Sequence, residues 1–154
     1  MYPTITEMRG EALKVAKKQG YVHMGLGARL YSDDIDTDSR TLFNSLSQFW
    51  SMLTLISLNE LNFRIEETNR ENDIVANSTI YDAIYGIVKE DAESIKWLND
   101  NIVPIMEKDF MDNQIVHNEA RLEIGTSWAK LKELPINATI EEIEEIKGKL
   151  NEEE

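Results

Sequence analysis

The chain has 154 residues, of which 42% are hydrophobic, and it contains no cysteine. A chain of this length buries roughly 70% of its unfolded surface, which is enough for one domain with a core. The absence of cysteine excludes disulfides, thiol nucleophiles and Cys-ligated metal sites, and no apolar run approaches the roughly 20 residues of a membrane span. We therefore expect a soluble, cytoplasmic protein.

The net charge is −13, from 16 basic and 29 acidic residues, and it is unevenly distributed. Eight acidic residues and two lysines lie from Glu133 to the end of the chain. This balance argues against a free-standing nucleic-acid-binding protein, which normally presents a basic face. His23 and His117 are far apart in the sequence, so we interpret both as surface or packing residues rather than metal ligands.

Helical spacing of apolar residues predicts a first helix over residues 4–18. Two short strands over 21–24 and 28–31 surround a glycine-rich turn and predict a hairpin. The acidic stretch 32–37 is predicted to be a loop. From residue 38 to about 67 the chain has neither glycine nor proline and keeps an apolar stripe, which predicts one long helix.

The second half of the chain predicts a further hairpin, with strands over 74–81 and 84–88 and a tip at 81–83. A second amphipathic helix is predicted over 91–108, and Pro104 is expected to kink or divide it. A strand is predicted over 119–124. Together these elements predict an α+β fold in which a small antiparallel sheet of β-hairpins packs on long helices.

The last segment, 134–154, is predicted to form an acidic tail helix that begins after Thr139, with Glu142 completing a capping box. Its isoleucines recur at helical spacing, so the helix is expected either to dock through them or to fray in solution. We interpret Trp97, Trp128 and the methionines as core residues.

Five local patterns give the sequence a more specific interpretation. They are, in chain order, Gly20-Tyr21-Val22; Gly27-Ala28-Arg29-Leu30-Tyr31; Arg40, Asn44 and Gln48; Tyr81-Asp82-Ala83; and Leu122-Glu123-Ile124-Gly125 with Trp128. In this order, and from Tyr2 to about Lys132, the chain resembles the C-terminal part of the palm of a family A (polymerase I-like) DNA polymerase, as found in a viral split-polymerase subunit or fragment.

The resemblance implies a catalytic role for the predicted hairpin tip. Asp82 stands where the family has an aspartate that binds catalytic Mg²⁺, and Tyr81 stands beside the primer terminus. Two-metal phosphoryl transfer needs carboxylates that hold two ions roughly 3.5–4 Å apart. The alternative is a plain turn aspartate, which favours bonds to its own backbone.

The resemblance also implies contacts with primer–template DNA. Arg40, Asn44 and Gln48 are spaced by four residues, so they line one face of the predicted long helix. One cation and two amides on such a stripe can donate hydrogen bonds to phosphates and to minor-groove acceptors. Arg29 is the implied phosphate contact of the first hairpin. The alternative for the stripe is a solvated polar face.

The sequence departs from the family pattern at several positions. Ala83 replaces the usual glutamate, and Tyr81 replaces the usual histidine, which removes a second acid and an imidazole. Phe49 and Trp50 replace a Gly-Thr pair, and Arg29 is the only arginine of a usual pair. Ala83 weakens the expectation of catalysis because alanine cannot replace a carboxylate.

The family's other catalytic aspartate, its nucleotide-binding fingers and its thumb have no counterpart in this sequence. We therefore expect a DNA-directed DNA polymerase that is incomplete as an isolated chain, with residues 1–133 as a palm portion and 134–154 as an added tail. Its implied partners are a polymerase chain carrying the upstream palm, fingers and thumb, primer–template DNA and dNTPs, but no membrane. That partner chain would complete the two-Mg²⁺ site. One alternative is an inactive palm remnant that serves as an acidic interaction module; another is a structural α+β protein with a chance resemblance.

Overall fold

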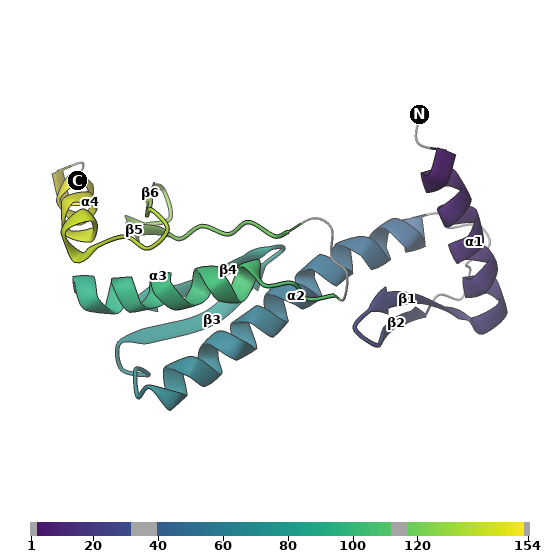
Figure 1. Cartoon of the computed structure of the whole chain (residues 1–154), viewed down its shortest axis with the longest axis horizontal. Helices are drawn as coiled ribbons and strands as arrows, with labels where there is room; N and C mark the ends of the chain where they lie inside the picture. The colour runs from purple at the N-terminus through teal and green to yellow at the C-terminus, as the bar shows by residue number, and fades with distance from the viewer. Residues whose placement is uncertain (1–2, 32–39, 112–116, 153–154) are drawn as a thin grey trace. The chain divides into compact units, whose positions relative to one another are not determined.

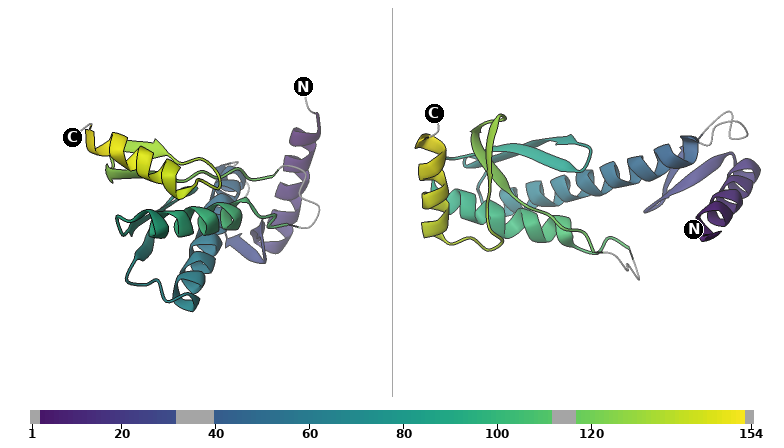
Figure 2. Two further views of the ribbon diagram at one scale, coloured as in Figure 1. Left: turned by 60° about the vertical axis from the view of Figure 1, so that its left-hand side comes forward. Right: turned by 90° about the horizontal axis from the view of Figure 1, so that it is seen from above.

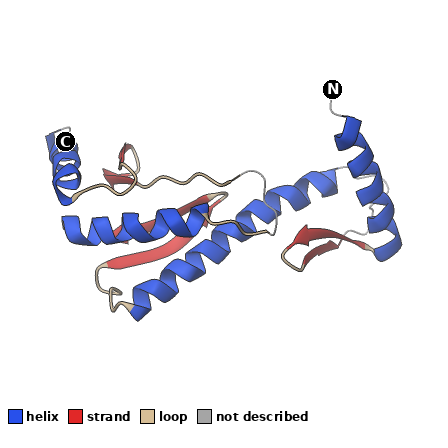
Figure 3. Ribbon diagram, in the orientation of Figure 1, coloured by secondary structure: helices blue, strands red, loops and turns tan. Residues whose placement is uncertain are grey.

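The computed structural model describes residues 3–31, 40–111 and 117–152, so the loop predicted over 32–37 lies outside the described residues. The described part has four helices and three two-stranded antiparallel sheets, which confirms the predicted α+β class (Figures 1 and 3). The elements are α1 (Pro3–Gln19), β1 (Tyr21–Gly25), β2 (Ala28–Tyr31), α2 (Arg40–Glu67), β3 (Ile74–Ile80), β4 (Ala83–Val88), α3 (Ala92–Glu107), β5 (Glu123–Ser127), β6 (Lys130–Glu133) and α4 (Ile140–Glu152).

The chain forms two compact units, Met1–Met52 and Leu53–Glu154, and the division between them falls within α2. A boundary at residue 133 was predicted instead, from the family resemblance. The two divisions follow different criteria, because one rests on contacts within the folded chain and the other on family resemblance. The predicted boundary therefore stays a prediction.

The first unit contains α1 and the β1–β2 hairpin, and both predicted elements are confirmed. Ala16 of α1 and Val22 of β1 are buried together, and Leu13 packs against them. The hairpin turn places Leu26 and Gly27 at φ 47° and 80°. Two successive positive φ angles suit the right-handed twist of a two-residue hairpin, and glycine reaches this region without strain.

The second unit has a main core in which α2, β3 and α3 meet. The buried residues of this core are Leu61, Ile65, Ile74, Ala76, Ile102, Val103 and Ile105. In β3, Ile74 and Ala76 are buried while Val75 between them is exposed, as expected for a strand with one face on the core. The β3–β4 hairpin is therefore held by the two helices from one side.

Helix α3 continues through Pro104 to Glu107, so the expected division of this helix was wrong. Pro104 lies in the last turn, where a missing N–H removes only one hydrogen bond near the end of the helix. The other end of α3 is capped by Asp91, whose carboxylate accepts the N–H of Ser94 at 2.8 Å.

The acidic tail helix α4 docks on the second unit. It contributes to a second core, made of Ala92, Ile95, Ile124, Leu134, Ala138, Ile143 and Leu150. The predicted capping box is confirmed, because Thr139 and Glu142 exchange hydrogen bonds of 2.8 and 3.2 Å. Two α3 side chains, Asn99 and Lys96, also bind the carbonyl oxygens of Pro135 and Ala138. Of the two predicted states, docked or frayed, the structure shows the docked one (Figure 2).

The strand predicted over 119–124 lies further along, at β5, and it pairs with β6, which the sequence did not predict. Gly125 was interpreted as the end of the strand, but it lies inside β5. A Cβ atom at this position would stand 2.0 Å from the Lys130 carbonyl oxygen, so the two strands approach too closely for any other residue.

Candidate metal-binding hairpin

The candidate metal ligand Asp82 lies in the turn of the β3–β4 hairpin. Ile80 pairs with Ala83, which leaves Tyr81 and Asp82 as a two-residue turn. Ala83 was predicted in the tip, but it is the first residue of β4. Both turn side chains are exposed, and that of Tyr81 is 82% exposed. The two strands that carry the turn pack on the main core, so the backbone position of the turn carboxylate is fixed.

The Asp82 carboxylate makes no hydrogen bond or ion pair with any residue that the structure describes. A plain turn aspartate commonly accepts a hydrogen bond from the backbone two residues ahead. That bond does not occur here among the described residues. The carboxylate is therefore free to accept a ligand from outside the second unit.

Tyr81 adopts φ 54°, in the left-handed region. For a residue with a Cβ this conformation costs roughly 1–2 kcal/mol, and glycine, asparagine or aspartate normally occupies such positions. Leu26 adopts the same region in the β1–β2 turn, so a bulky residue at positive φ is common to these two hairpin turns. This strain was not predictable from the local residues, because it depends on the register of the two strands.

The candidate DNA-binding residues belong to the first unit. Helix α2 begins at Arg40, so Arg40, Asn44 and Gln48 stand on one continuous helix, as predicted. Gln48 is exposed, whereas the side chains of Arg40 and Asn44 lie outside the described residues. Asp82 and Tyr81 belong to the second unit. The structure thus brings together the two turn residues and, separately, the three residues of the helix.

Arg29 lies on β2, and its guanidinium stands 4.7 Å from the ring centroid of Tyr21. A hydrogen bond with Tyr31, together with the two tyrosine rings, holds the pKa of Arg29 above its ordinary value. The group is exposed and stays charged at every physiological pH. The phosphate contact that the resemblance implies for Arg29 stays a prediction.

Trp128 is not a core residue, and this prediction was wrong. It is 72% exposed and stacks on Tyr85 of β4, with ring centroids 4.7 Å apart and planes inclined by 18°. Ser127 pairs with Lys130, so Trp128 occupies the two-residue turn between β5 and β6, from which a side chain cannot enter the core. Trp97 and Met106, in contrast, pack against the main core, as predicted. Met111 is 46% exposed, so the prediction of a core residue was wrong there.

The stack joins the turn of the β5–β6 hairpin to the strand that follows Asp82. The sequence did not predict this contact, because the Gly-x2-Trp pattern was interpreted only as part of the family resemblance. Aromatic pairs of this geometry contribute roughly 0.5–1.5 kcal/mol beyond the area they bury. The stack therefore helps to fix β4, which leads away from the candidate site.

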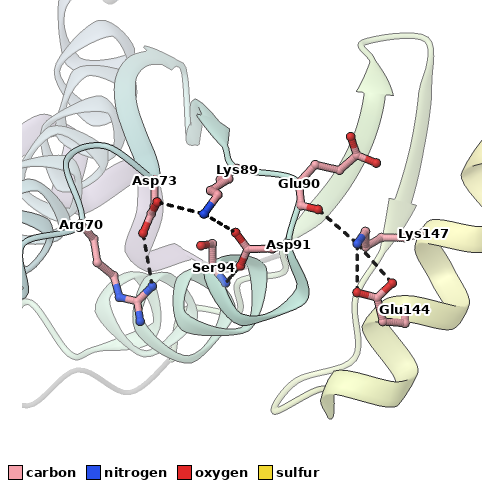
Figure 4. Close-up of polar contacts among 8 residues, drawn as sticks. All are labelled: Arg70, Asp73, Lys89, Glu90, Asp91, Ser94, Glu144 and Lys147. Atoms are coloured by element: carbon pink, nitrogen blue, oxygen red, sulfur yellow. Dashed lines mark hydrogen bonds and ion pairs between the residues drawn. The ribbon is translucent and has the colours of Figure 1, made fainter.

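A cluster of charged residues lies at the other end of the β3–β4 hairpin (Figure 4). Several of them line an open depression of about 630 Å³. Asp73 stands between Arg70, at 3.9 Å, and Lys89, at 3.7 Å. Lys89 also contacts Asp91 at 3.3 Å. The N–H of Ser94, and to a lesser degree Lys89, lowers the pKa of Asp91.

In the same cluster, Lys147 of α4 donates to the Glu90 carbonyl at 3.3 Å and pairs with Glu144 at 3.0 Å (Figure 4). Each cation faces an anion or a carbonyl, so the cluster is a tether between the start of α3 and the tail helix. It lies away from Asp82, and we assign it no catalytic role.

Both histidines are on the surface, as predicted. His117 is exposed and contacts Asp109 at 2.9 Å, and His23 is exposed beside Tyr21. Within the described ranges, no three His, Asp or Glu side chains gather closely enough to hold a metal ion. None of the described helices is long and apolar enough to cross a membrane.

The chain was compared with family models, curated proteins and solved structures, and none of them matches it.

Proposed function

We propose that this chain is the C-terminal palm portion of a family A DNA polymerase, in which Asp82 binds catalytic Mg²⁺. The observation that carries the proposal is the unpaired carboxylate on a two-residue hairpin turn. Support also comes from the element order, since a long helix, a hairpin and a second helix follow one another as the motifs require. Arg29, Arg40, Asn44 and Gln48 are the proposed contacts to primer–template DNA.

The proposed chemistry is nucleotidyl transfer at a two-Mg²⁺ site. One ion would activate the primer 3′-hydroxyl, and the other would stabilise the leaving pyrophosphate. Asp82 is one ligand of this site, and Tyr81 is proposed to donate a hydrogen bond near the primer terminus. The remaining carboxylates, the fingers and the thumb would come from a partner chain or from the rest of a longer protein.

The proposal is tested by isolating the protein from its native cell and identifying what binds to it. We expect a polypeptide that carries the upstream palm aspartate and the fingers, and we expect the pair to extend a primer with Mg²⁺ and dNTPs. The isolated chain should extend no primer. Templated synthesis by the pure chain alone, or a reconstituted complex without synthesis, would contradict the proposal.

A second candidate function is an acidic interaction module derived from a palm. It is favoured by the distribution of charge: residues 53–154 contain 10 basic and 23 acidic residues, whereas residues 1–52 contain six of each. The whole net charge of −13 thus lies in the second unit. The two functions are distinguished by Asp82→Asn, which should abolish synthesis in the first case and leave partner binding unchanged in both.

A further inference from the structure

One face of the β1–β2 hairpin carries two tyrosines, a histidine and an arginine. In the antiparallel register, Tyr21 lies opposite Tyr31 and His23 lies opposite Arg29. Because successive side chains of a strand point to opposite faces, these four residues share one face. The opposite face packs on α1 through the buried Val22.

The four side chains form a continuous surface, which we call the aromatic face. The ring of Tyr21 lies 5.1 Å from that of His23 and 5.5 Å from that of Tyr31, while Arg29 stands over it at 4.7 Å. Tyr31 is 67% exposed, and Arg29 and His23 are exposed as well. Exposed planar groups are therefore available to a ligand.

The segment that forms α1 and the hairpin is basic, although residues 1–52 as a whole carry no net charge. Residues 3–31 contain five basic and two acidic side chains, a net charge of +3. Two of the basic residues, Lys17 and Lys18, are in the last turn of α1, directly before the hairpin. Four aspartates between residues 33 and 38 follow it and lie outside the described residues. Lys18, next to the hairpin in the chain, and Arg29 on it therefore supply the positive charge that can pair with phosphates, whereas the four aspartates make the whole unit neutral.

We propose that the aromatic face binds single-stranded DNA by stacking bases on Tyr31 and on the Arg29 guanidinium. Proteins that bind single strands combine positive charge along the backbone with aromatic side chains, and each stacked base contributes substantially to affinity. A duplex is a poorer ligand, because its bases are already stacked on one another. The choice of DNA rests on the proposed function, whereas the stacking surface does not depend on Asp82.

The test measures the affinity of the full chain for a fluorescent oligothymidine by anisotropy, at low ionic strength and without Mg²⁺ or a partner. Tyr31→Ala should weaken binding by about tenfold, because one stacking platform is lost. Tyr31→Phe should stay within about twofold of the wild type, since it keeps the ring. Phe63→Ala, which removes a 66% exposed aromatic residue from α2, is the matched control and should have no effect.

Arg29→Lys distinguishes the contribution of stacking from that of charge, because lysine keeps the positive charge but lacks the planar guanidinium. We expect it to weaken binding, and we expect a duplex of equal length to bind less tightly than the single strand. The proposal is overturned if Tyr31→Ala binds as well as the wild type, if Phe63→Ala weakens binding equally, or if no saturable binding occurs. Failure of this test would leave the proposed role of Asp82 in a reconstituted complex unaffected. Likewise, failure of the Asp82 test would leave single-strand binding by the aromatic face unaffected.

Discussion

At the scale of single residues, the proposed function depends most on the turn residue Asp82. Asp82→Asn removes the charge with almost no change in shape, so the complex should assemble normally. The metal ion that Asp82 is proposed to hold would stabilise the transition state by several kcal/mol. We therefore expect primer extension by the complex to fall about a hundredfold or more. Single-turnover extension with saturating dNTP measures this effect.

The matched control for Asp82 is Asp100→Asn, which removes one exposed carboxylate that pairs with Lys96 on α3. It should leave the extension rate unchanged. Near-normal extension by Asp82→Asn would mean that the hairpin turn is structural and that the metal is held elsewhere.

Tyr81 offers a test of strain at the same turn. Tyr81→Gly should raise the free energy of unfolding by roughly 1 kcal/mol, because glycine adopts positive φ without a Cβ clash. The same variant should lower primer extension in the complex, since it removes the proposed hydrogen-bond donor. Urea denaturation followed by circular dichroism measures the first effect.

Asn69 provides a comparison for Tyr81, because it has the same φ of 54°. Asparagine tolerates this region better than tyrosine does, so Asn69→Gly should gain less stability. If Tyr81→Gly is instead less stable than the wild type, the tyrosine ring contributes packing that outweighs its backbone strain.

At the scale of elements, the Asp91 cap stabilises the N-terminus of α3. Asp91→Ala should lower the free energy of unfolding by about 0.5–2 kcal/mol, whereas Asp91→Asn keeps an acceptor and should lose less. The pKa of Asp91 is lowered in the folded state. Its ionised form therefore stabilises the fold above the ordinary aspartate pKa, and this contribution is lost as the pH falls through the lowered value.

The urea midpoint of the wild type and of Asp91→Asn, measured between neutral and acidic pH, checks this dependence. The wild type should lose more stability on acidification than Asp91→Asn does. Parallel pH profiles for the two proteins would show that the carboxylate of Asp91 does not contribute through its charge.

The elements also show what the sequence can predict and where such prediction ends. Helices α1, α2, α3 and α4 and the β3–β4 hairpin were predicted, because apolar periodicity persists over their whole length. Strand β6 has only four residues and alternates lysine with leucine and glutamate, so its pattern is too short to distinguish it from a loop. The exposure of Trp128 follows from that missed turn.

The candidate site was likewise predicted only in part. A turn that contains Asp82 was predicted from the two flanking strands. Its exact size, the placement of Ala83 in β4 and the strain at Tyr81 depend on the pairing register, which includes a bulge between Ala76 and Ser78. Local sequence carries little information about such a bulge.

At the scale of the whole molecule, the question is how much the tail helix α4 contributes to the stability of the second unit. If residues 134–154 were only an added tail, as the resemblance implies, deletion after Leu134 would leave folding largely intact. The packing predicts the opposite, because Ile143 is 0% exposed and Leu150 is 3% exposed within the second core. Burial of each such side chain contributes about 1.5–3 kcal/mol, and a domain is stable by only about 5–15 kcal/mol.

Deletion of residues 135–154 should therefore strongly lower the stability of the second unit, because it also exposes Ala92, Ile95 and Ile124 of the second core. Ile143→Ala should cost about 2–5 kcal/mol in the full chain, whereas Ile140→Ala, at a position 36% exposed, should cost less. Urea unfolding followed by circular dichroism compares the three proteins with the wild type. A truncated chain that unfolds at the same urea concentration as the wild type would show that α4 is an independent addition, as the family resemblance alone suggested.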